Sequence, residues 1–188
     1  MKKVLFMMLA VVMFAGCSKE DENQNQLENI IQSMDQSQLS AMDIMKSAEC
    51  WQVKIIYQYT EAGGKGDSKL YYDPENQKLE GASRGANYRV ADGNIYELRS
   101  HPLTGMPYYY TYALSGTGNS FSLVRKHDSL AKTMNIVAYD DKSMVIEFYN
   151  PAIKEYPYSR EYIVRWSPND EYWDMLTAYE DLPEDERP

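Results

Sequence analysis

The chain has 188 residues, of which 28 are acidic and 19 basic, so its formal net charge is −9. This length predicts one domain of ordinary size, and the 44% hydrophobic content excludes a globally disordered chain. The acidic balance argues against a nucleic-acid-binding protein, which usually presents a basic face. The expectation that there is no nucleic-acid partner rests mainly on the membrane address that the first residues predict.

The first 16 residues predict a signal peptide of the lipoprotein type. Lys2 and Lys3 form a basic start, and the apolar run 4–14 is too short to span a bilayer, which takes about 20 helical residues. The run that ends this segment resembles the lipobox of bacterial lipoproteins: Phe14-Ala15-Gly16-Cys17. The resemblance implies that Cys17 carries the lipid and becomes the mature N-terminus, which makes the membrane a partner. An ordinary secretory signal with an incidental cysteine is the alternative.

Residues 17–27 are polar, lack periodicity and predict a flexible acidic stalk. Within them, Lys19-Glu20-Asp21-Glu22 resembles the export signal of surface lipoproteins in Bacteroidota, and a solvated spacer is the other interpretation. We therefore expect a lipid-anchored protein of the outer membrane, with exposure at the cell surface left open.

Residues 28–48 predict a helical lead-in to the domain. The apolar positions recur at helical spacing, as one helix over 28–47 or as two short helices broken near Ser37. They are Leu27, Ile30, Ile31, Met34, Ala41, Met42 and Met45. Such a stripe indicates packing on the chain's own domain or, as the alternative, a methionine-rich face for a partner.

From residue 50 onward, short strand patterns separated by turn signals replace the helical pattern. Asp92-Gly93, for example, supplies the positive φ angles of a two-residue hairpin. Strands are expected near 51–60, 69–73, 77–83, 86–91, 94–100, 107–114, 120–126, 134–140, 143–149 and 159–166. The predicted fold class is therefore mainly β: a small antiparallel up-and-down β-barrel over 49–168, preceded by an N-terminal helix and followed by an acidic tail, 169–188.

Three stretches of this region resemble the lipocalin-like domains of Bacteroidota lipoproteins. They are Glu49-Cys50-Trp51-Gln52-Val53, Tyr88-Arg89-Val90 with Asn94-Ile95-Tyr96, and Tyr162-Ile163-Val164-Arg165-Trp166. The resemblance implies a closed or nearly closed barrel with a small interior, which in some relatives binds an apolar ligand. It also implies that Trp51 closes the barrel floor and that Arg165 packs over its ring, although Glu49 stands where the family has glycine.

The sequence offers no pattern typical of catalysis. The consecutive residues His127, Asp128 and Ser129 cannot form a relay, because adjacent side chains on a strand or turn point apart. No group of cysteines and histidines has the spacing of a zinc site. We therefore expect no enzyme, no cofactor and no metal. With Cys17 lipidated, Cys50 has no partner for a disulfide, and it is interpreted as a buried inert thiol or, alternatively, a reactive one.

Tyrosine is over-used, with 17 tyrosines against 4 phenylalanines. Tyr108, Tyr110 and Tyr112 alternate along one strand and therefore share a face. Their rings and hydroxyls suit an apolar or glycan-like ligand in the barrel mouth, or a protein partner, whereas ordinary β-propensity also explains them. Two functions follow: a lipid-anchored envelope binding protein, or a non-enzymatic accessory subunit that docks on an outer-membrane assembly through the 28–47 helix or the tyrosine faces.

Overall fold

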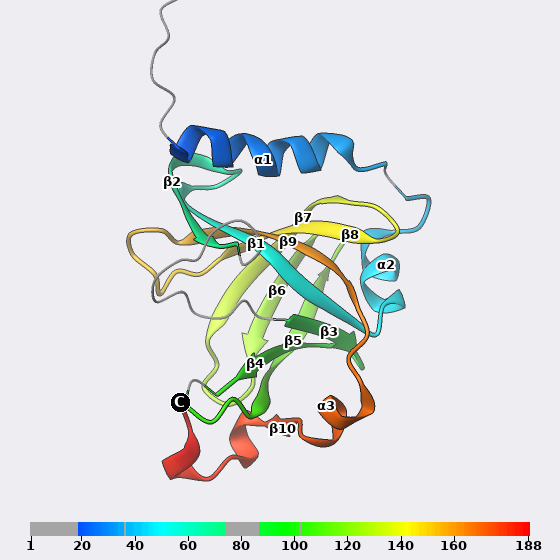
Figure 1. Cartoon of the computed structure of the whole chain (residues 1–188), viewed down its shortest axis with the longest axis vertical. Helices are drawn as coiled ribbons and strands as arrows, with labels where there is room; N and C mark the ends of the chain where they lie inside the picture. The colour runs from blue at the N-terminus through cyan, green and yellow to red at the C-terminus, as the bar shows by residue number, and fades with distance from the viewer. Residues whose placement is uncertain (1–18, 36, 74–86, 102) are drawn as a thin grey trace, which may run out of the picture.

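The computed structural model describes residues 19–35, 37–73, 87–101 and 103–188. Figure 1 shows the helices and strands along the chain. In chain order they are α1 (Lys19–Ser33), α2 (Ala41–Ser47), β1 (Cys50–Glu61), β2 (Lys65–Tyr72), β3 (Asn87–Ala91), β4 (Asn94–Ser100), β5 (Pro107–Thr117), β6 (Ser120–Arg125), β7 (Ala131–Tyr139), β8 (Ser143–Tyr149), β9 (Tyr158–Trp166), α3 (Asp170–Asp174), β10 (Thr177–Ala178) and the short 3-10 helices η1 (Tyr179–Asp181) and η2 (Glu184–Glu186). The strand expected at 77–83 lies outside the described residues.

Eight of these strands close into an antiparallel barrel (Figure 1). The order around the barrel is β1-β3-β4-β5-β6-β7-β8-β9, and β9 returns to β1. β2 pairs only with the far half of β1, and the two strands form a hairpin beside the ring. Between β3 and β4, Asp92 and Gly93 have φ angles of 53° and 71°, as a two-residue hairpin turn requires. The mainly β, up-and-down barrel predicted from the sequence is confirmed.

The N-terminal helical region consists of two helices separated after Ser33, so the two-helix alternative is the correct one. Ser40 begins the second helix, because its side chain accepts a hydrogen bond from the backbone N–H of Asp43 at 3.2 Å. The predicted boundary between stalk and helix at residue 28 is wrong: α1 already begins at Lys19, within the segment assigned to a flexible stalk. Lys, Glu and Gln have high helix propensity, so a polar run can extend a helix that packing holds at its other end.

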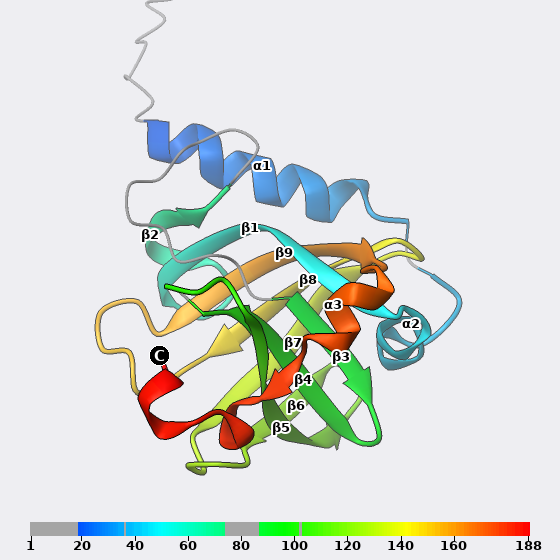
Figure 2. The ribbon, with the colours of Figure 1, turned by 60° about the horizontal axis from the view of Figure 1, so that its bottom comes forward.

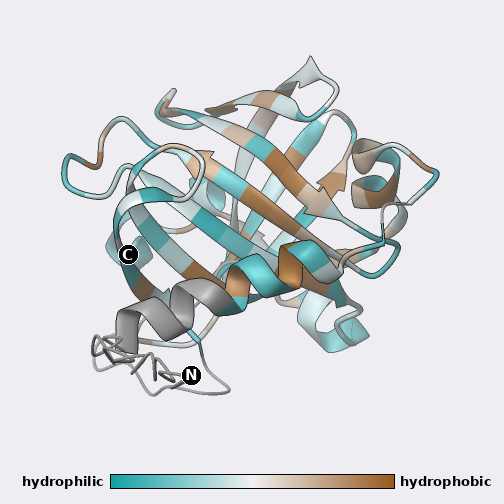
Figure 3. Cartoon of the chain, turned by 90° about the horizontal axis from the view of Figure 1, so that it is seen from above, coloured by the Kyte–Doolittle hydropathy of each residue, from teal (hydrophilic) through white to brown (hydrophobic). Residues whose placement is uncertain are grey.

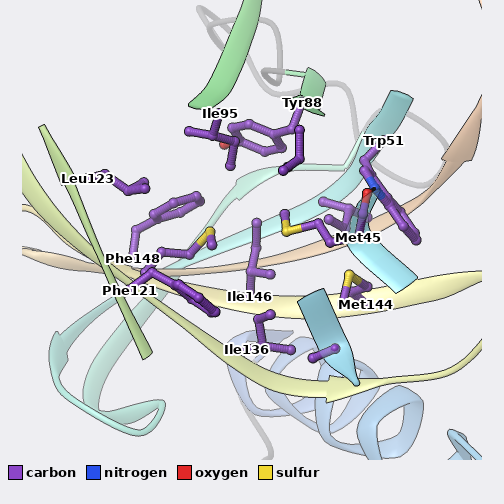
Figure 4. Packing of buried hydrophobic residues seen from close by; sticks show 14 of the residues in the cluster. Met45, Trp51, Tyr88, Ile95, Phe121, Leu123, Ile136, Met144, Ile146 and Phe148 are labelled. Atoms are coloured by element: carbon purple, nitrogen blue, oxygen red, sulfur yellow. Dashed lines mark hydrogen bonds between the residues drawn. The ribbon is translucent and has the colours of Figure 1, made fainter. Parts of the chain in front are cut away.

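Apolar side chains fill the half of the barrel nearest the start of β1, which we call the floor (Figure 4). Helix α2 lies across this end, and its residues Ile44 and Met45 belong to the same buried cluster as Trp51. Further members from around the barrel are Val53, Ile95, Phe121, Leu123, Met134, Ile136, Met144, Ile146, Phe148 and Ile163. This half of the barrel is therefore a packed core.

Helix α1 covers one outer side of the barrel (Figures 1 and 3). Its Leu27 is buried in a second cluster with Ile55, Tyr57 and Tyr59 of β1 and Val145 of β8. These β1 and β8 residues alternate with the inward-facing ones, so both faces of the two strands are buried.

An ion-pair group joins α1 to the barrel wall beside this cluster. The Arg160 Nε of β9 bonds to Glu147 Oε2 of β8 at 2.9 Å, and its Nη1 bonds to Glu28 Oε1 of α1 at 2.8 Å. Arg160 and Glu147 are both buried. The backbone N–H of Gly63 donates a further hydrogen bond to Glu147 Oε2 at 3.0 Å.

The opposite end of the barrel, where β4 ends, β5 begins, β8 ends and β9 begins, is called the mouth. The C-terminal segment runs past this end (Figure 2). There β10 adds to the start of β5 in parallel, through the pairs Thr177–Tyr108 and Ala178–Tyr109. The acidic tail contains the short helix α3, and its strand β10 was not predicted because two residues are too few to show alternation. In the described part of the chain, no helix combines the length and apolar character needed to cross a membrane.

Candidate functional site

The floor residues Trp51 and Arg165 lie together at the start of β1 and the end of β9. Trp51 is fully buried, and its Nε1–H donates a hydrogen bond to the backbone oxygen of Met45 at 2.8 Å. The Arg165 guanidinium carbon lies 5.4 Å from the centroid of the Trp51 ring, within the range of a cation–π contact. Arg165 also donates to Ser47 Oγ at 2.6 Å and to the backbone oxygen of Asp141. This arrangement fastens α2 to the barrel.

The tyrosines of β5 share a face, and this face is the inner one. Tyr112 belongs to the buried core, and Lys132 Nζ lies 4.3 Å from its ring centroid. Tyr108 and Tyr110 are packed edge to face at 5.5 Å between centroids. Tyr179 of η1 then covers Tyr110 at 4.7 Å. Burial raises the pKa of all three β5 tyrosines above the ordinary value of about 10. The stripe therefore lies in the interior near the mouth, and its first member, Tyr108, also lines a hollow at the rim.

A pocket of about 170 Å³ lies inside the barrel on the mouth side of the core. Six polar side chains from five strands are among its lining residues: Gln58, Tyr88, Glu97, Arg99, Lys132 and Glu161. The neighbouring Ile56 and Phe148 form its boundary with the core. We call it the mouth pocket.

Three of the four charged groups of the mouth pocket are paired with one another, and the fourth, Glu161, is hydrogen-bonded to a tyrosine. Lys132 Nζ bonds to Glu97 Oε2 at 2.7 Å, and Arg99 Nε bonds to Glu97 Oε1 at 2.8 Å. On the other side, the Tyr88 hydroxyl donates a hydrogen bond to Glu161 Oε2 at 2.7 Å. Glu97 and Glu161 are buried, whereas 35% of the Arg99 side chain is exposed. Two buried carboxylates and two cations thus converge on one small space.

The two carboxyl groups differ in their electrostatic surroundings. Burial alone would raise the pKa of Glu97, but Lys132 and Arg99 outweigh burial and hold this pKa well below its usual range. Burial raises the pKa of Glu161 above its ordinary value, and the hydrogen bond from Tyr88 opposes this shift only in part. Two neighbouring carboxyl groups whose pKa values are shifted in opposite directions are typical of functional sites.

The sequence interpretation missed this pocket, although one signal was available. Glu161 and Ile163 are two residues apart on β9 and share a face, so the strand face that carries an apolar core residue also carries a carboxylate. Glu97 shows the same pattern beside Ile95 on β4. A charged residue on the inward face of a strand is costly to bury, and its position therefore marks a candidate site. The partners could not be assigned, because they lie on different strands.

A second hollow of about 170 Å³ lies outside the barrel, between the 101–106 loop and the C-terminal segment. Met106, Tyr108 and Leu182 give it a mainly apolar lining. Leu103 stands at its edge with 90% of its side chain exposed, and 49% of Met106 is exposed. Apolar side chains exposed next to a hollow are typical of contact surfaces.

Other candidate groups are placed as follows. Cys50 is buried, and burial raises the pKa of its thiol to about 12, which leaves almost no reactive thiolate at neutral pH. Among the described residues, no three or more His, Cys, Asp or Glu side chains are grouped as a metal site would need. Cys17 lies outside the described residues.

Comparisons with known proteins yield similar folds but no family. No protein-family model matches the chain, and no curated protein matches it. Similar solved structures include a lipocalin-like protein from Bacteroides uniformis, with a TM-score of 0.41, 14% identity, and coverage of 63% of this chain and 97% of that one. An uncharacterised protein from Bacteroides eggerthii has a TM-score of 0.40, 11% identity, and coverage of 63% and 98%. The barrel itself is established by the strand pairing of this chain.

Proposed function

We propose that this protein is a lipid-anchored envelope binding protein whose small ligand occupies the mouth pocket. The observation that carries the proposal is the convergence of Glu97, Arg99, Lys132 and Glu161 on one space inside the barrel. Burying paired charges is often no more favourable than burying apolar residues of similar size, so stability alone does not account for them. Polar groups that converge at the end of a barrel are instead typical of a site that orients a ligand.

The dimensions of the pocket define the ligand further. The described apolar side chains of the floor half pack into one core, which occupies the space that an acyl chain would need there. The volume of about 170 Å³ lies below the range of roughly 300–1,000 Å³ that is usual for drug-sized ligands. Of the two ligand classes expected from the sequence, a small polar, glycan-like molecule fits this site better than an apolar one.

Filling the pocket should abolish binding. Ser159 lines the pocket from β9, and in Ser159→Phe the ring would occupy the space of the ligand. We expect small sugars, sugar acids and aromatic amides that perturb the NMR signals of pocket residues in the wild type to lose this effect. The matched control is Ser122→Phe on β6, where the residue is exposed. Equal ligand-induced shifts in Ser159→Phe and wild type would contradict the site.

The lipid anchor is tested separately. Cys17→Ser removes the sulfur that a diacylglycerol group needs, and about 0.8 kcal/mol of membrane affinity is lost for each CH₂ no longer inserted. We expect the variant to move from the membrane fraction to the soluble fraction when cells are fractionated. Cys50→Ser is the matched control, because that thiol is buried in the domain. Retention of Cys17→Ser on membranes would rule out this anchor.

The accessory-subunit alternative is favoured by one observation, the exposed Leu103 and Met106 beside the outer hollow. In this function an envelope protein would place an apolar side chain there. Leu103→Asp should then eliminate the cross-linked products that the wild type forms in native membranes, while Ser159→Phe should leave them intact. The opposite pattern would favour the ligand-binding function.

A further inference from the structure

We propose that the mouth pocket is specific for a small carboxylate anion and that Glu161 takes up one proton when this anion binds. This inference rests on the binding function proposed above and defines its ligand class and its regulation. It follows from the charges around the pocket and from the position of Glu161 among them.

Among the described charged residues that line the pocket, Glu161 is the one whose protonation decides the net charge. The described charged residues that line it are Glu97, Arg99, Lys132 and Glu161. With both carboxyl groups ionised, two positive and two negative charges cancel, and the pocket has no net attraction for an anion. With Glu161 protonated the pocket carries one positive charge, which the carboxylate of a ligand neutralises. Anion binding and protonation of Glu161 are therefore coupled.

Glu97 cannot take the place of Glu161 in this exchange. It is held ionised by two cations, since Lys132 Nζ lies 2.7 Å and Arg99 Nε 2.8 Å from its oxygens. Protonating it would leave both cations without their partner. The pKa directions agree, because Lys132 and Arg99 outweigh burial and lower the pKa of Glu97, whereas burial raises that of Glu161.

The surroundings of Glu161 contain few groups that could stabilise its charge. The Tyr88 hydroxyl of β3 donates to Oε2 at 2.7 Å, and Ser159 Oγ on the same strand lies 3.4 Å from Oε1. The charged groups that interact electrostatically with Glu161 are Lys132 on β7 and Glu97 and Arg99 on β4. Tyr71 of β2 is the other described titratable residue that lines the pocket. The cations bond directly to Glu97 and not to Glu161. Glu161 is thus the carboxyl group that protonates first.

The cations also provide contacts for the incoming carboxylate. Lys132 and Arg99 line the pocket, and the partly exposed Arg99 guanidinium faces it from the edge. Arg99 uses N–H groups on Nε and Nη2 for Glu97, so three of its five N–H donors are not used by Glu97 and can bind a carboxylate. A protonated Glu161 donates a further hydrogen bond to a carboxylate oxygen. A neutral ligand of the same shape gains neither the charge nor the proton coupling.

The experiment compares matched anionic and neutral probes on the purified full chain. Benzoate is paired with benzamide, and glucuronate with glucose, in calorimetric titrations between about pH 5 and pH 8, where the carboxylates stay ionised. We expect each carboxylate to bind at least about tenfold more tightly than its neutral counterpart at the lower pH. Above the pKa of Glu161 in the free protein, the affinity should fall about tenfold per pH unit, because binding then requires a proton. Whichever carboxylate binds more tightly distinguishes a free aromatic acid from an acidic glycan end as the source.

Two variants test the roles of the residues. Glu161→Gln keeps the shape of the pocket but carries no titrating group, so its affinity for the carboxylate should be independent of pH over the same range. Above the pKa of Glu161 in the free protein, titrations in buffers of different ionisation enthalpy should give an uptake close to one proton in the wild type and none in the variant. Lys132→Met should weaken carboxylate binding while its circular dichroism stays that of the wild type. If Lys132→Met does not fold, Glu161→Gln still decides the question.

The outcomes separate this inference from the proposed function. Tight binding of a neutral probe, or carboxylate binding with no pH dependence and no proton uptake, would overturn the inference and leave the ligand site standing. If neither the anionic nor the neutral probes bind, and Ser159→Phe behaves like the wild type with every compound tested, the mouth pocket is not a ligand site and both proposals fail.

Discussion

Trp51→Ala is expected to lower the free energy of unfolding by about 3–5 kcal/mol, the range for removing a buried aromatic side chain from a core. The ring is fully buried, and its removal leaves a cavity between α2 and the barrel wall. The change also removes the hydrogen bond to the Met45 oxygen and the ring beneath Arg165. Urea denaturation followed by circular dichroism measures the effect, as a lower midpoint with little change in slope.

Two further variants divide this effect into its causes. Trp51→Phe keeps most of the volume but leaves the Met45 carbonyl without its donor, which should cost about 1–3 kcal/mol. Trp173 on α3 is only partly buried, so Trp173→Ala should lower the free energy of unfolding much less. If Trp51→Ala destabilises the protein no more than Trp173→Ala, Trp51 is not the residue that holds the floor together.

Arg160→Met is the second change for which we expect a large effect, again about 3–5 kcal/mol, because it leaves Glu147 buried without its partner. Methionine fills much of the space of the arginine stem, so lost volume contributes little. The bond between Arg160 and Glu28 is lost as well, and with it the polar tie to α1. Denaturation midpoints measure the loss, and hydrogen exchange in α1 shows whether this helix opens before the barrel does.

The double variant Arg160→Met with Glu147→Leu is the critical control. Removing both charges eliminates the unpaired buried carboxylate, so most of the lost stability should return. Glu28→Gln removes only the outer contact, whose carboxylate side chain is 46% exposed, and should cost less than about 1 kcal/mol. A double variant as unstable as the single one would mean that the charges themselves are needed for the fold.

The barrel thus divides into two halves with different tasks. The floor half carries its apolar core, the α2 contact and the Trp51–Arg165 pair, and it supplies stability. The mouth half places charged and hydroxyl groups inside the same wall, at a cost in desolvation. Because the floor supplies the stability, variants in the mouth pocket are expected to alter binding more than folding.

The fold class and the location of most strands follow from local patterns in the sequence. Alternation is a local property: Met144, Ile146 and Phe148 face one way on β8 whatever surrounds them, and this pattern predicts a strand with a buried face. The hairpin turn at residues 92–93 is equally local, since the positive φ angles depend on the residues of the turn itself. The same holds for the shared face of Tyr108, Tyr110 and Tyr112.

Which strand faces lie inside the barrel, and which side chains meet there, depends on how the strands close into a ring. Alternation places the β5 tyrosines on one face but does not say whether this face is inner or outer. The interior exists only once β1 pairs with both β3 and β9 and so closes the ring. Tyr88 and Glu161 form their hydrogen bond although they are 73 residues apart in the chain, and no spacing rule connects them. The start of α1 was hidden for a related reason, since its polar first turns belong to a helix that packing on the barrel through Leu27 holds in place. The local pattern therefore specifies strands, whereas the charged pocket exists only because barrel closure brings distant strands to face one another.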